Sequence, residues 1–226
     1  MSIKLEDRVG ASWAANPAIQ KLFESEMVKA IAKKVSEERT KKKVYPSQEN
    51  VFRAFRETPL STVRVVWMGQ DPYNSPGQAT GLAMDCGKYV SPTIEKILGV
   101  YNKEYPQSFN PDLMEGKLTR WARQGVFLFN AALTVVDNQA KSHLEIWQPF
   151  TKEILKVLIY DQNPKVFLGL GKDAQNLLGN VPGPHTLLKY EHPVYASYQQ
   201  RDWDAVGIFH KVNEILKFYG RPEIDW

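Results

Sequence analysis

The 226-residue sequence contains one cysteine and no long apolar run. A single cysteine, Cys86, excludes an intrachain disulfide. No stretch approaches the roughly 18 apolar residues of a membrane-spanning helix. The N-terminus lacks a basic segment followed by an apolar one, so we expect no secretory signal. These absences predict a protein without membrane contact, located in the cytoplasm, or in the nucleus if its source is eukaryotic or viral.

Histidine is also scarce, and the four histidines do not stand at a spacing typical of metal ligands. We therefore predict chemistry without a metal or another cofactor. One segment, Gly169-Leu-Gly-Lys172, resembles a phosphate-binding loop. It lacks the upstream glycine, however, and Asp173 stands where that loop has Ser or Thr. Binding of a nucleoside triphosphate is not expected.

The chain has the size and apolar content of one α/β domain. Hydrophobic residues make up 43% of it, and no low-complexity tract or internal repeat divides it. We predict a single domain over residues 1–226, with residues 1–40 as its helical N-terminal part. The net charge of +4 permits binding to a polyanion without requiring it. We interpret a basic run at residues 39–43 as a solvated helix end followed by a loop.

Apolar spacing predicts helices that alternate with strands. Over residues 17–36 apolar side chains recur at helical spacing. Further helices are expected over residues 93–101 and 150–160, and strands over residues 62–68, 125–131, 164–170 and 186–190. Alternating strands and helices predict a parallel sheet covered on both sides. In such sheets, ligands bind at the carboxyl ends of the strands.

The most informative segment is Val65-Val-Trp-Met-Gly-Gln-Asp-Pro-Tyr-Asn74. Its apolar run ends in Gly69, which predicts a buried strand whose carboxyl end opens into a turn. Pro72 fixes its own φ and favours an extended Asp71, so Asp71 and Tyr73 are held stiffly at this edge. On this segment alone two interpretations stay open, because Asp71 either caps a helix or works in a cleft.

Two further apolar runs are each followed by a polar residue. Asn130 lies at the end of the run that starts at Gly125, and its amide must find partners. Those partners are either neighbouring backbone groups or a planar ligand with a complementary edge. His192 and Pro193 follow the last predicted strand. A single histidine is more often structural than catalytic, but three polar residues placed in this way predict one shared site.

These segments resemble the family 1 uracil-DNA glycosylases. Residues 69–73 match the family's water-activating motif, and Asn74 departs from the His that follows it there. Gln124, Gly125 and residues 130–135 match the Asn-bearing motif, while His192, Pro193 and Ser197 match the His-Pro motif. The resemblance covers residues 40–226 and is weakest before them. It implies an α/β fold of three α/β/α layers, with a central four-stranded parallel sheet and a site at the carboxyl edge.

The resemblance implies hydrolysis of the N-glycosidic bond of uracil in DNA, which leaves an abasic site. The base must leave the stack, because its bond to the sugar cannot be reached inside a duplex. By resemblance, Asp71 places negative charge near the oxocarbenium-like sugar and positions the water. His192 donates a hydrogen bond to uracil O2, and the backbone N–H groups of Gln70 and Asp71 belong to the same oxyanion hole.

The resemblance assigns base choice to Asn130 and Tyr73. The Asn130 amide would face uracil O4 with its N–H and uracil N3–H with its C=O, a pattern that cytosine reverses. Tyr73 would exclude the methyl group of thymine. Met84 stands where the family stacks the base on a Phe, and it is apolar and adaptable but has no π-face.

Several positions that hold DNA in the family differ here. Lys172 replaces a phosphate-binding Ser, and Ala196 aligns with a wedge leucine although it is too small to fill a base gap well. Tyr195 is expected to serve as the wedge instead. The residues expected to contact DNA are Asn74, Thr93, Lys172, Tyr195, Ala196 and Ser197.

Three hypotheses compete for the function. The first is an active uracil-DNA glycosylase with divergent DNA-binding residues, and the retained Asp71 and His192 favour it. The second is a glycosylase with a shifted base choice, because Met84 leaves a looser pocket wall. The third is a DNA-binding or scaffold protein without activity. The expected partner is uracil-containing DNA, single- or double-stranded. The chain is expected to be a monomer, and the resemblance implies a protein inhibitor as a further partner.

Overall fold

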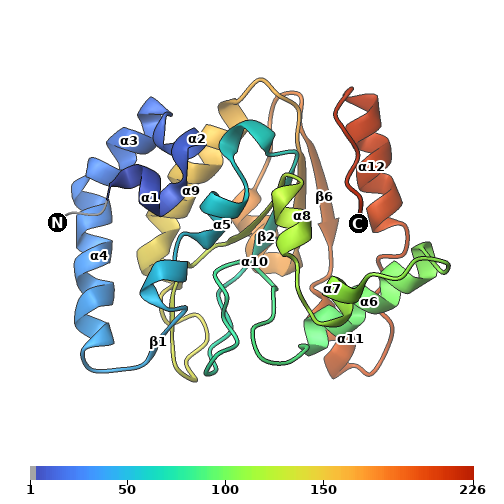
Figure 1. The fold of residues 1–226 in the computed structure, drawn as a ribbon, viewed down its shortest axis with the longest axis horizontal. Helices are drawn as coiled ribbons and strands as arrows, with labels where there is room; N and C mark the ends of the chain where they lie inside the picture. Colours follow the sequence, from blue (N-terminus) through green and yellow to red (C-terminus); the bar gives the residue numbers. More distant parts are fainter. Residues whose placement is uncertain (1–3) are drawn as a thin grey trace.

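A four-stranded parallel sheet forms the centre of the protein, with helices on both of its faces (Figure 1). The computed structural model describes residues 4–226. The strands are β2 (Val65–Gly69), β3 (Val126–Asn130), β5 (Val166–Leu170) and β6 (Thr186–Tyr190), in the spatial order β3-β2-β5-β6. Every residue of β2, β3 and β5 is buried, as is typical of parallel strands covered on both faces.

The four predicted strands are confirmed, with corrected boundaries. The first one begins at Val65 rather than at residue 62, because a short 3-10 helix, η2 (Leu60–Thr62), comes before it. The carboxyl ends of the strands lie level, since Gly69 pairs with Asn130 and Leu170 pairs with Tyr190. Residues that follow different strands therefore meet at one edge of the sheet.

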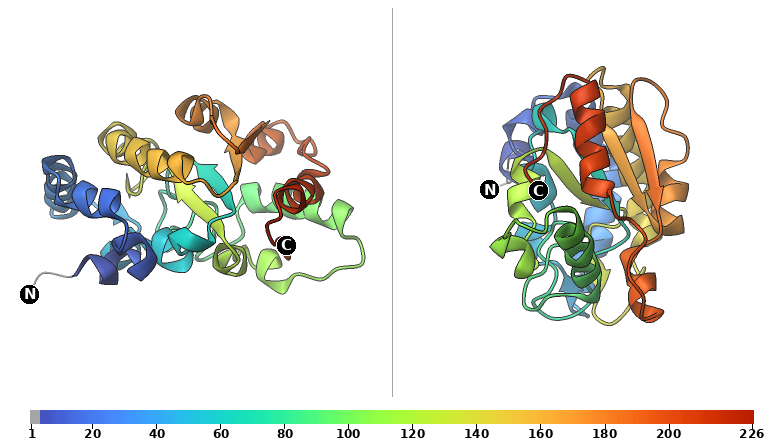
Figure 2. Two further views of the ribbon diagram at one scale, coloured as in Figure 1. Left: turned by 90° about the horizontal axis from the view of Figure 1, so that it is seen from above. Right: turned by 90° about the vertical axis from the view of Figure 1, so that its right-hand side faces the viewer.

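Two helical layers cover the sheet (Figure 2). On one face lie α9 (Leu144–Tyr160) and α10 (Gly171–Leu178), and on the other lie α8 (Thr119–Arg123) and α12 (Ile208–Phe218). The Trp67 ring of β2 stacks on the Trp121 ring of α8 at 5.8 Å and lies 6.4 Å from the Phe209 ring of α12. The predicted three-layer arrangement around a four-stranded parallel sheet is confirmed.

The N-terminal part is helical, but the helix predicted over residues 17–36 is wrong in its continuity. Two helices replace it, α3 (Pro17–Glu24) and α4 (Glu26–Arg39). Ser25 separates them in an extended conformation, and its hydroxyl accepts a hydrogen bond from the Val28 N–H at 3.3 Å. This contact caps α4 and lets the chain turn between the helices. The Phe23 ring of α3 then packs on the Phe150 ring of α9 at 5.7 Å.

The remaining elements connect and flank these layers. The helix predicted over residues 150–160 is the second half of α9, which continues through Pro149, and the one predicted over residues 93–101 is part of α6 (Pro92–Glu104). Strands β1 (Val44–Tyr45) and β4 (Val135–Val136) pair antiparallel. The shorter helices are α1 (Leu5–Val9), α2 (Ala11–Ala14), η1 (Gln48–Asn50), α5 (Arg53–Glu57), α7 (Pro111–Met114) and α11 (Pro193–Tyr198).

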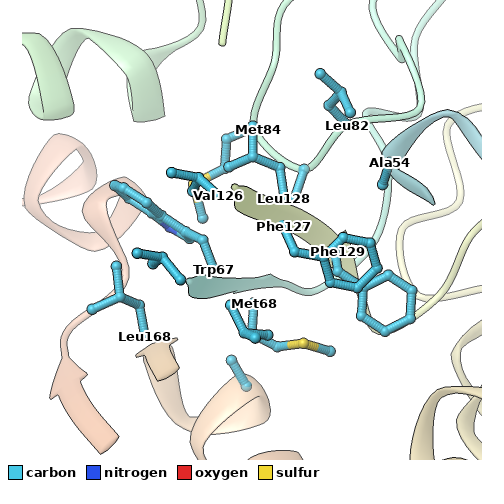
Figure 3. Close-up of a cluster of buried hydrophobic side chains, with 14 of the residues drawn as sticks. Ala54, Trp67, Met68, Leu82, Met84, Val126, Phe127, Leu128, Phe129 and Leu168 are labelled. Atoms are coloured by element: carbon cyan, nitrogen blue, oxygen red, sulfur yellow. The ribbon is translucent and has the colours of Figure 1, made fainter. Parts of the chain in front are cut away.

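Apolar side chains fill the space between the sheet and its helices (Figure 3). Successive side chains of a strand point to opposite faces, so Trp67 and Met68 extend from β2 in opposite directions. Met84 joins this buried cluster from the long segment between β2 and α6. Over residues 4–226, no helix has both the length and the apolar character that crossing a bilayer would need.

Candidate active site

The three polar segments singled out in the sequence meet at the carboxyl edge of the sheet. They line a cavity of about 260 Å³ that is closed on further sides by the segment before α6 and by α11. Its lining includes eight of the residues expected to act on substrate or DNA, namely Gln70, Asp71, Tyr73, Asn74, Met84, Thr93, Asn130 and His192. The level strand ends explain this meeting, because each segment follows a different strand.

Asp71 faces this cavity and does not cap a helix. One of its carboxylate oxygens accepts a hydrogen bond from the Lys141 backbone N–H at 2.6 Å. Burial raises the pKa of Asp71 above its ordinary value, and the hydrogen bond from Lys141 works in the opposite direction. The carboxylate is thus placed in a poorly solvated position and oriented through a single backbone donor.

Asn130 ends β3 directly beside the end of β2. A side chain at Gly69 would bring its Cβ within 2.2 Å of the Asn130 Oδ1 atom, so only glycine leaves room for this amide. The side chain is 7% exposed, and its amide forms no hydrogen bond with another residue of the described range. Buried amides are normally satisfied, so the donor and acceptor of Asn130 are available to a ligand in the cavity.

His192 follows β6 and has two functions at once. It is the N-cap of α11, where its Nδ1 accepts a hydrogen bond from the Val194 N–H at 3.2 Å. A neutral imidazole that accepts at Nδ1 carries its proton on Nε2. Burial lowers the pKa of His192, which favours this neutral form. Gly171 makes the approach possible, because a Cβ there would lie 2.9 Å from the His192 Cβ.

Tyr73 forms a stiff wall of the cavity. Its hydroxyl donates to the Met84 carbonyl at 2.9 Å and lies 2.7 Å from the Ser91 hydroxyl. Burial raises the pKa of Tyr73, so the phenol stays protonated at neutral pH. Met84 itself is 8% exposed, has a φ of 66° and contacts both the cavity and the core. A positive φ in a residue other than glycine is uncommon and is concentrated at functional sites.

The other residues expected to contact DNA lie around this cavity. Lys172 is exposed in the first turn of α10, and Tyr195 is 53% exposed on α11. The Ser197 hydroxyl donates to the Pro92 carbonyl at 3.1 Å and so links α11 to α6. Ala196 is fully buried on α11, and the contact of this residue with DNA stays a prediction. The side chain of Tyr195, next to it, faces solvent.

Three residues near the cavity were not among the predicted site residues. Tyr198 lines the cavity and places its ring 6.4 Å from the Tyr195 ring, so two exposed aromatic side chains stand side by side on α11. Lys141 holds Asp71, and Asp173 binds Lys141 at 2.7 Å. The pair of aromatic residues three positions apart was a usable signal for Tyr198. Nothing local in the sequence marks Lys141 or Asp173.

The site is identified by its chemistry rather than by its size. A larger hollow of about 750 Å³ lies between α6, α12 and the C-terminal segment. There His210 binds the Glu104 carboxylate at 2.7 Å, and that carboxylate also accepts from the backbone at the start of α12. The His210 and Glu104 side chains are therefore already paired with each other. Among residues 4–226, no three His, Cys, Asp or Glu side chains are grouped to hold a metal ion, and metal-free chemistry stays a prediction.

The sequence is similar to known proteins over most of its length. The sequence pattern of the Uracil DNA glycosylase superfamily matches residues 55–217. The uracil-DNA glycosylase of Leuconostoc mesenteroides is 36% identical over 220 residues, which cover 95% of this chain and 96% of the relative. That of Pseudomonas paraeruginosa is 37% identical over an alignment of 228 positions, which covers 99% of this chain and 95% of the relative.

Solved structures show the same fold. Mimivirus uracil-DNA glycosylase superposes with a TM-score of 0.82 at 24% identity, over 93% of this chain and 86% of that chain. Two further structures of mimivirus variants are complexes with UGI.

Proposed function

Because this chain belongs to the Uracil DNA glycosylase superfamily, we propose that it hydrolyses the N-glycosidic bond of uracil in DNA and leaves an abasic site. One observation carries the proposal. A carboxylate, an amide and a neutral imidazole, each with unused hydrogen-bonding capacity, converge on one cavity of about 260 Å³. A flipped nucleotide is bound through hydrogen bonds to its base, which groups of this kind can form.

Asp71 acts on the sugar and the water. As the bond to the base breaks, the sugar develops positive charge, and a nearby carboxylate stabilises it. Asp71 is held by Lys141 at one oxygen, which leaves the other oxygen for the water that attacks the sugar. Because the group is partly removed from solvent, its charge acts more strongly than it would in water.

His192 acts on the leaving base. The departing uracil becomes an anion, and its O2 needs a donor that is already in position. The bond from the Val194 N–H to Nδ1 leaves the proton of His192 on Nε2. A neutral imidazole donates this proton as a hydrogen bond without having to transfer it. The backbone N–H groups of Gln70 and Asp71 are proposed to add to the same hole.

Asn130 and Tyr73 choose the base. Asn130 pairs with the O4 and N3–H edge of uracil, and cytosine would leave buried groups unpaired at about 1–3 kcal/mol each. The Tyr73 ring, fixed through its hydroxyl, occupies the space that a thymine methyl would need. Met84 packs against the flipped base with its adaptable side chain.

The DNA backbone is bound around the cavity. Lys172 supplies a charged phosphate contact, while Asn74, Thr93 and Ser197 supply polar ones. Tyr195, exposed on α11, fills the gap that the flipped base leaves. A protein inhibitor is a further proposed partner, supported by the UGI complexes of the mimivirus proteins. Added UGI should then abolish base release, and unchanged release would refute this partner.

The function is tested with single-stranded oligonucleotides that each carry one uracil, thymine, cytosine or 5-hydroxymethyluracil. After incubation, alkaline cleavage reveals abasic sites. Strand cleavage at uracil alone supports the proposal. Cleavage at another base would indicate a shifted base choice, and binding without cleavage at any base would indicate a DNA-binding protein without activity.

A further inference from the structure

Lys141 and Asp173 form an ion pair beside the cavity, and neither side chain has a part in the mechanism above. The Lys141 ammonium lies 2.7 Å from the Asp173 carboxylate. The same carboxylate oxygen accepts a hydrogen bond of 3.0 Å from the side-chain amide of Gln70. We call these three residues the clasp. They join the loop of residues 137–143 to α10 and to the segment that follows β2.

Lys141 also makes the contact that orients Asp71. Its backbone N–H donates to the Asp71 carboxylate at 2.6 Å, while its side chain reaches Asp173. Lys141 has a φ of 64°, in the left-handed region that favours glycine. A residue with a side chain stays in this region only where its surroundings fix it. The clasp holds the Lys141 side chain, Asp71 holds its backbone N–H, and its carbonyl accepts a hydrogen bond from the Leu144 N–H at 3.0 Å.

We propose that Asp173 is a positioning residue for base release, which holds Lys141 and thereby keeps the Lys141 N–H directed at the Asp71 carboxylate. This inference rests on the proposed function. Asp71 must face both the sugar and the attacking water, and misplacement by a fraction of an ångström weakens both interactions. Asp71 has no other hydrogen-bond donor among residues 4–226, so the position of the loop decides its orientation.

Two simpler roles make different predictions. The pair is half exposed, at 55% and 50%, and such pairs often contribute nothing measurable. A purely electrostatic role predicts a gain on removal, because Asp173 is an anion beside a surface that binds DNA. Positioning predicts a slower chemical step instead. The Michaelis constant and the turnover number therefore separate the three roles.

The first experiment measures kcat and KM of Asp173→Asn on a single-stranded uracil oligonucleotide. We expect kcat to fall by about two- to fivefold, on the scale of one lost ion pair, while KM stays the same or falls. Asp173→Glu keeps the carboxylate and should restore most of kcat. The matched control is Glu153→Gln, which breaks the Lys156–Glu153 pair of 2.6 Å and similar exposure on α9, and it should change neither constant. An unchanged or higher kcat in Asp173→Asn would overturn the proposal.

The second experiment tests whether Asp173 acts through Lys141. Lys141→Met keeps the backbone N–H and removes the ammonium. The double variant with Asp173→Asn should be no slower than the slower single variant, because both changes remove the same contact. If the fold-reductions of kcat in the two single variants multiplied in the double variant, Asp173 would not act through Lys141.

Hydrogen exchange of the Lys141 amide gives a readout that needs no activity. We expect faster exchange in Asp173→Asn and wild-type exchange in Glu153→Gln, because only the first change releases the loop. Equal exchange in all three proteins would overturn the proposal. A wild-type chain that released no uracil would count against the proposed function alone, since the exchange result stands without it.

Discussion

Buried polar side chains lie at both ends of the parallel strands, the amino edge and the carboxyl edge of the sheet. Only at the carboxyl edge do such side chains lack partners among residues 4–226. At the amino edge, the Lys165 side chain is completely buried, and its ammonium binds the Asp161 carboxylate at 2.5 Å and the Asn163 carbonyl at 2.8 Å. His185 uses both ring nitrogens, since Nδ1 accepts from the Lys165 N–H at 3.1 Å and Nε2 lies 2.9 Å from the Ile159 carbonyl. These groups stabilise one another.

The carboxyl edge reverses this arrangement. His192 follows β6 just as His185 precedes it, and its Nδ1 likewise accepts a backbone N–H. Its Nε2, however, has no hydrogen-bond partner among residues 4–226 and lies at the cavity with Asn130 and Asp71. Buried polar groups in proteins are normally satisfied, so several incompletely paired groups at one edge indicate that a ligand completes them. The contrast between the two histidines separates the structural role of His185 from the role proposed for His192.

The largest effect is expected from Asp71→Asn. The change keeps the shape and removes the charge that stabilises the sugar, so uracil release should slow by at least about a hundredfold. Burial raises the pKa of Asp71 in the folded protein, so its ionised form is disfavoured by folding. That cost exists above the folded-state pKa and disappears as the pH falls below the unfolded value of about 4.

The Asn variant should therefore melt at the same or a higher temperature at pH 7, and the gain should vanish at low pH. Single-turnover release and melting curves at several pH values check both parts. A variant that kept near wild-type release would contradict the role of Asp71.

The opposite outcome is expected at the amino edge. Asp161→Asn leaves the buried Lys165 ammonium without its carboxylate, although Asn163 still accepts from it. Burial lowers the pKa of Lys165, and the Asp161 carboxylate opposes that shift. Asp161 is partly exposed, so we expect a loss of about 1–3 kcal/mol in unfolding free energy with unchanged kcat. Urea denaturation and a measurement of kcat check this. A lower kcat in the folded variant would contradict a purely structural role of the amino edge.

Asn130→Asp tests the unpaired groups of the carboxyl edge further, because it replaces the amide of Asn130 by a carboxylate of the same shape. A carboxylate accepts from the N4 amine of cytosine, where the amide of Asn130 would face it with a donor. We expect cytosine release to appear and uracil release to fall by about tenfold or more, which corresponds to one unpaired buried group. Oligonucleotides with one cytosine and no uracil provide the measurement. The role of Asn130 in base recognition would be contradicted if a folded variant released cytosine no faster than the wild type does.

Lys172→Ala tests the outer part of the carboxyl edge. A lysine that binds a phosphate releases a counterion, so its removal should lower the slope of log affinity against log salt by about one. Binding of an oligonucleotide with a non-cleavable uracil analogue, measured at several salt concentrations, gives the slope. Lys156→Ala on α9 is the control, because Lys156 is exposed and paired with Glu153 away from the cavity. Equal slopes for the two variants would make Lys172 an ordinary surface residue.

The sequence predicted which groups meet at the cavity because their signals are local. A buried strand followed by a stiff polar segment can be read without the fold, and Asp71, Asn130 and His192 each follow such a strand. Parallel pairing then brings the strand ends together. The sequence predicts the strand boundaries only approximately, because apolar residues continue beyond the paired ones.

The features that the sequence missed depend on packing. The apolar spacing continues across Ser25. From this spacing alone, a serine that caps a second helix cannot be distinguished from a serine on the exposed face of one long helix. Lys141 and Asp173 are 32 positions apart, in segments without periodicity, and only the fold brings their charges together. The burial of Ala196 depends on how α11 rotates against α6, which its own residues do not decide.

The smallest effect is expected from Met84→Phe, where the cavity meets the core. Met84 contacts both, and stacking of a base on an aromatic ring is worth about 1–3 kcal/mol relative to alanine and less relative to methionine. We therefore expect single-turnover release of uracil to rise modestly, by about two- to fivefold, with little change in melting temperature. If Met84 serves the core instead, the larger ring overpacks it and lowers the melting temperature without a kinetic gain. Release rates and melting curves of the same preparation separate these results, and a destabilised variant with slower release would remove Met84 from the base-binding wall.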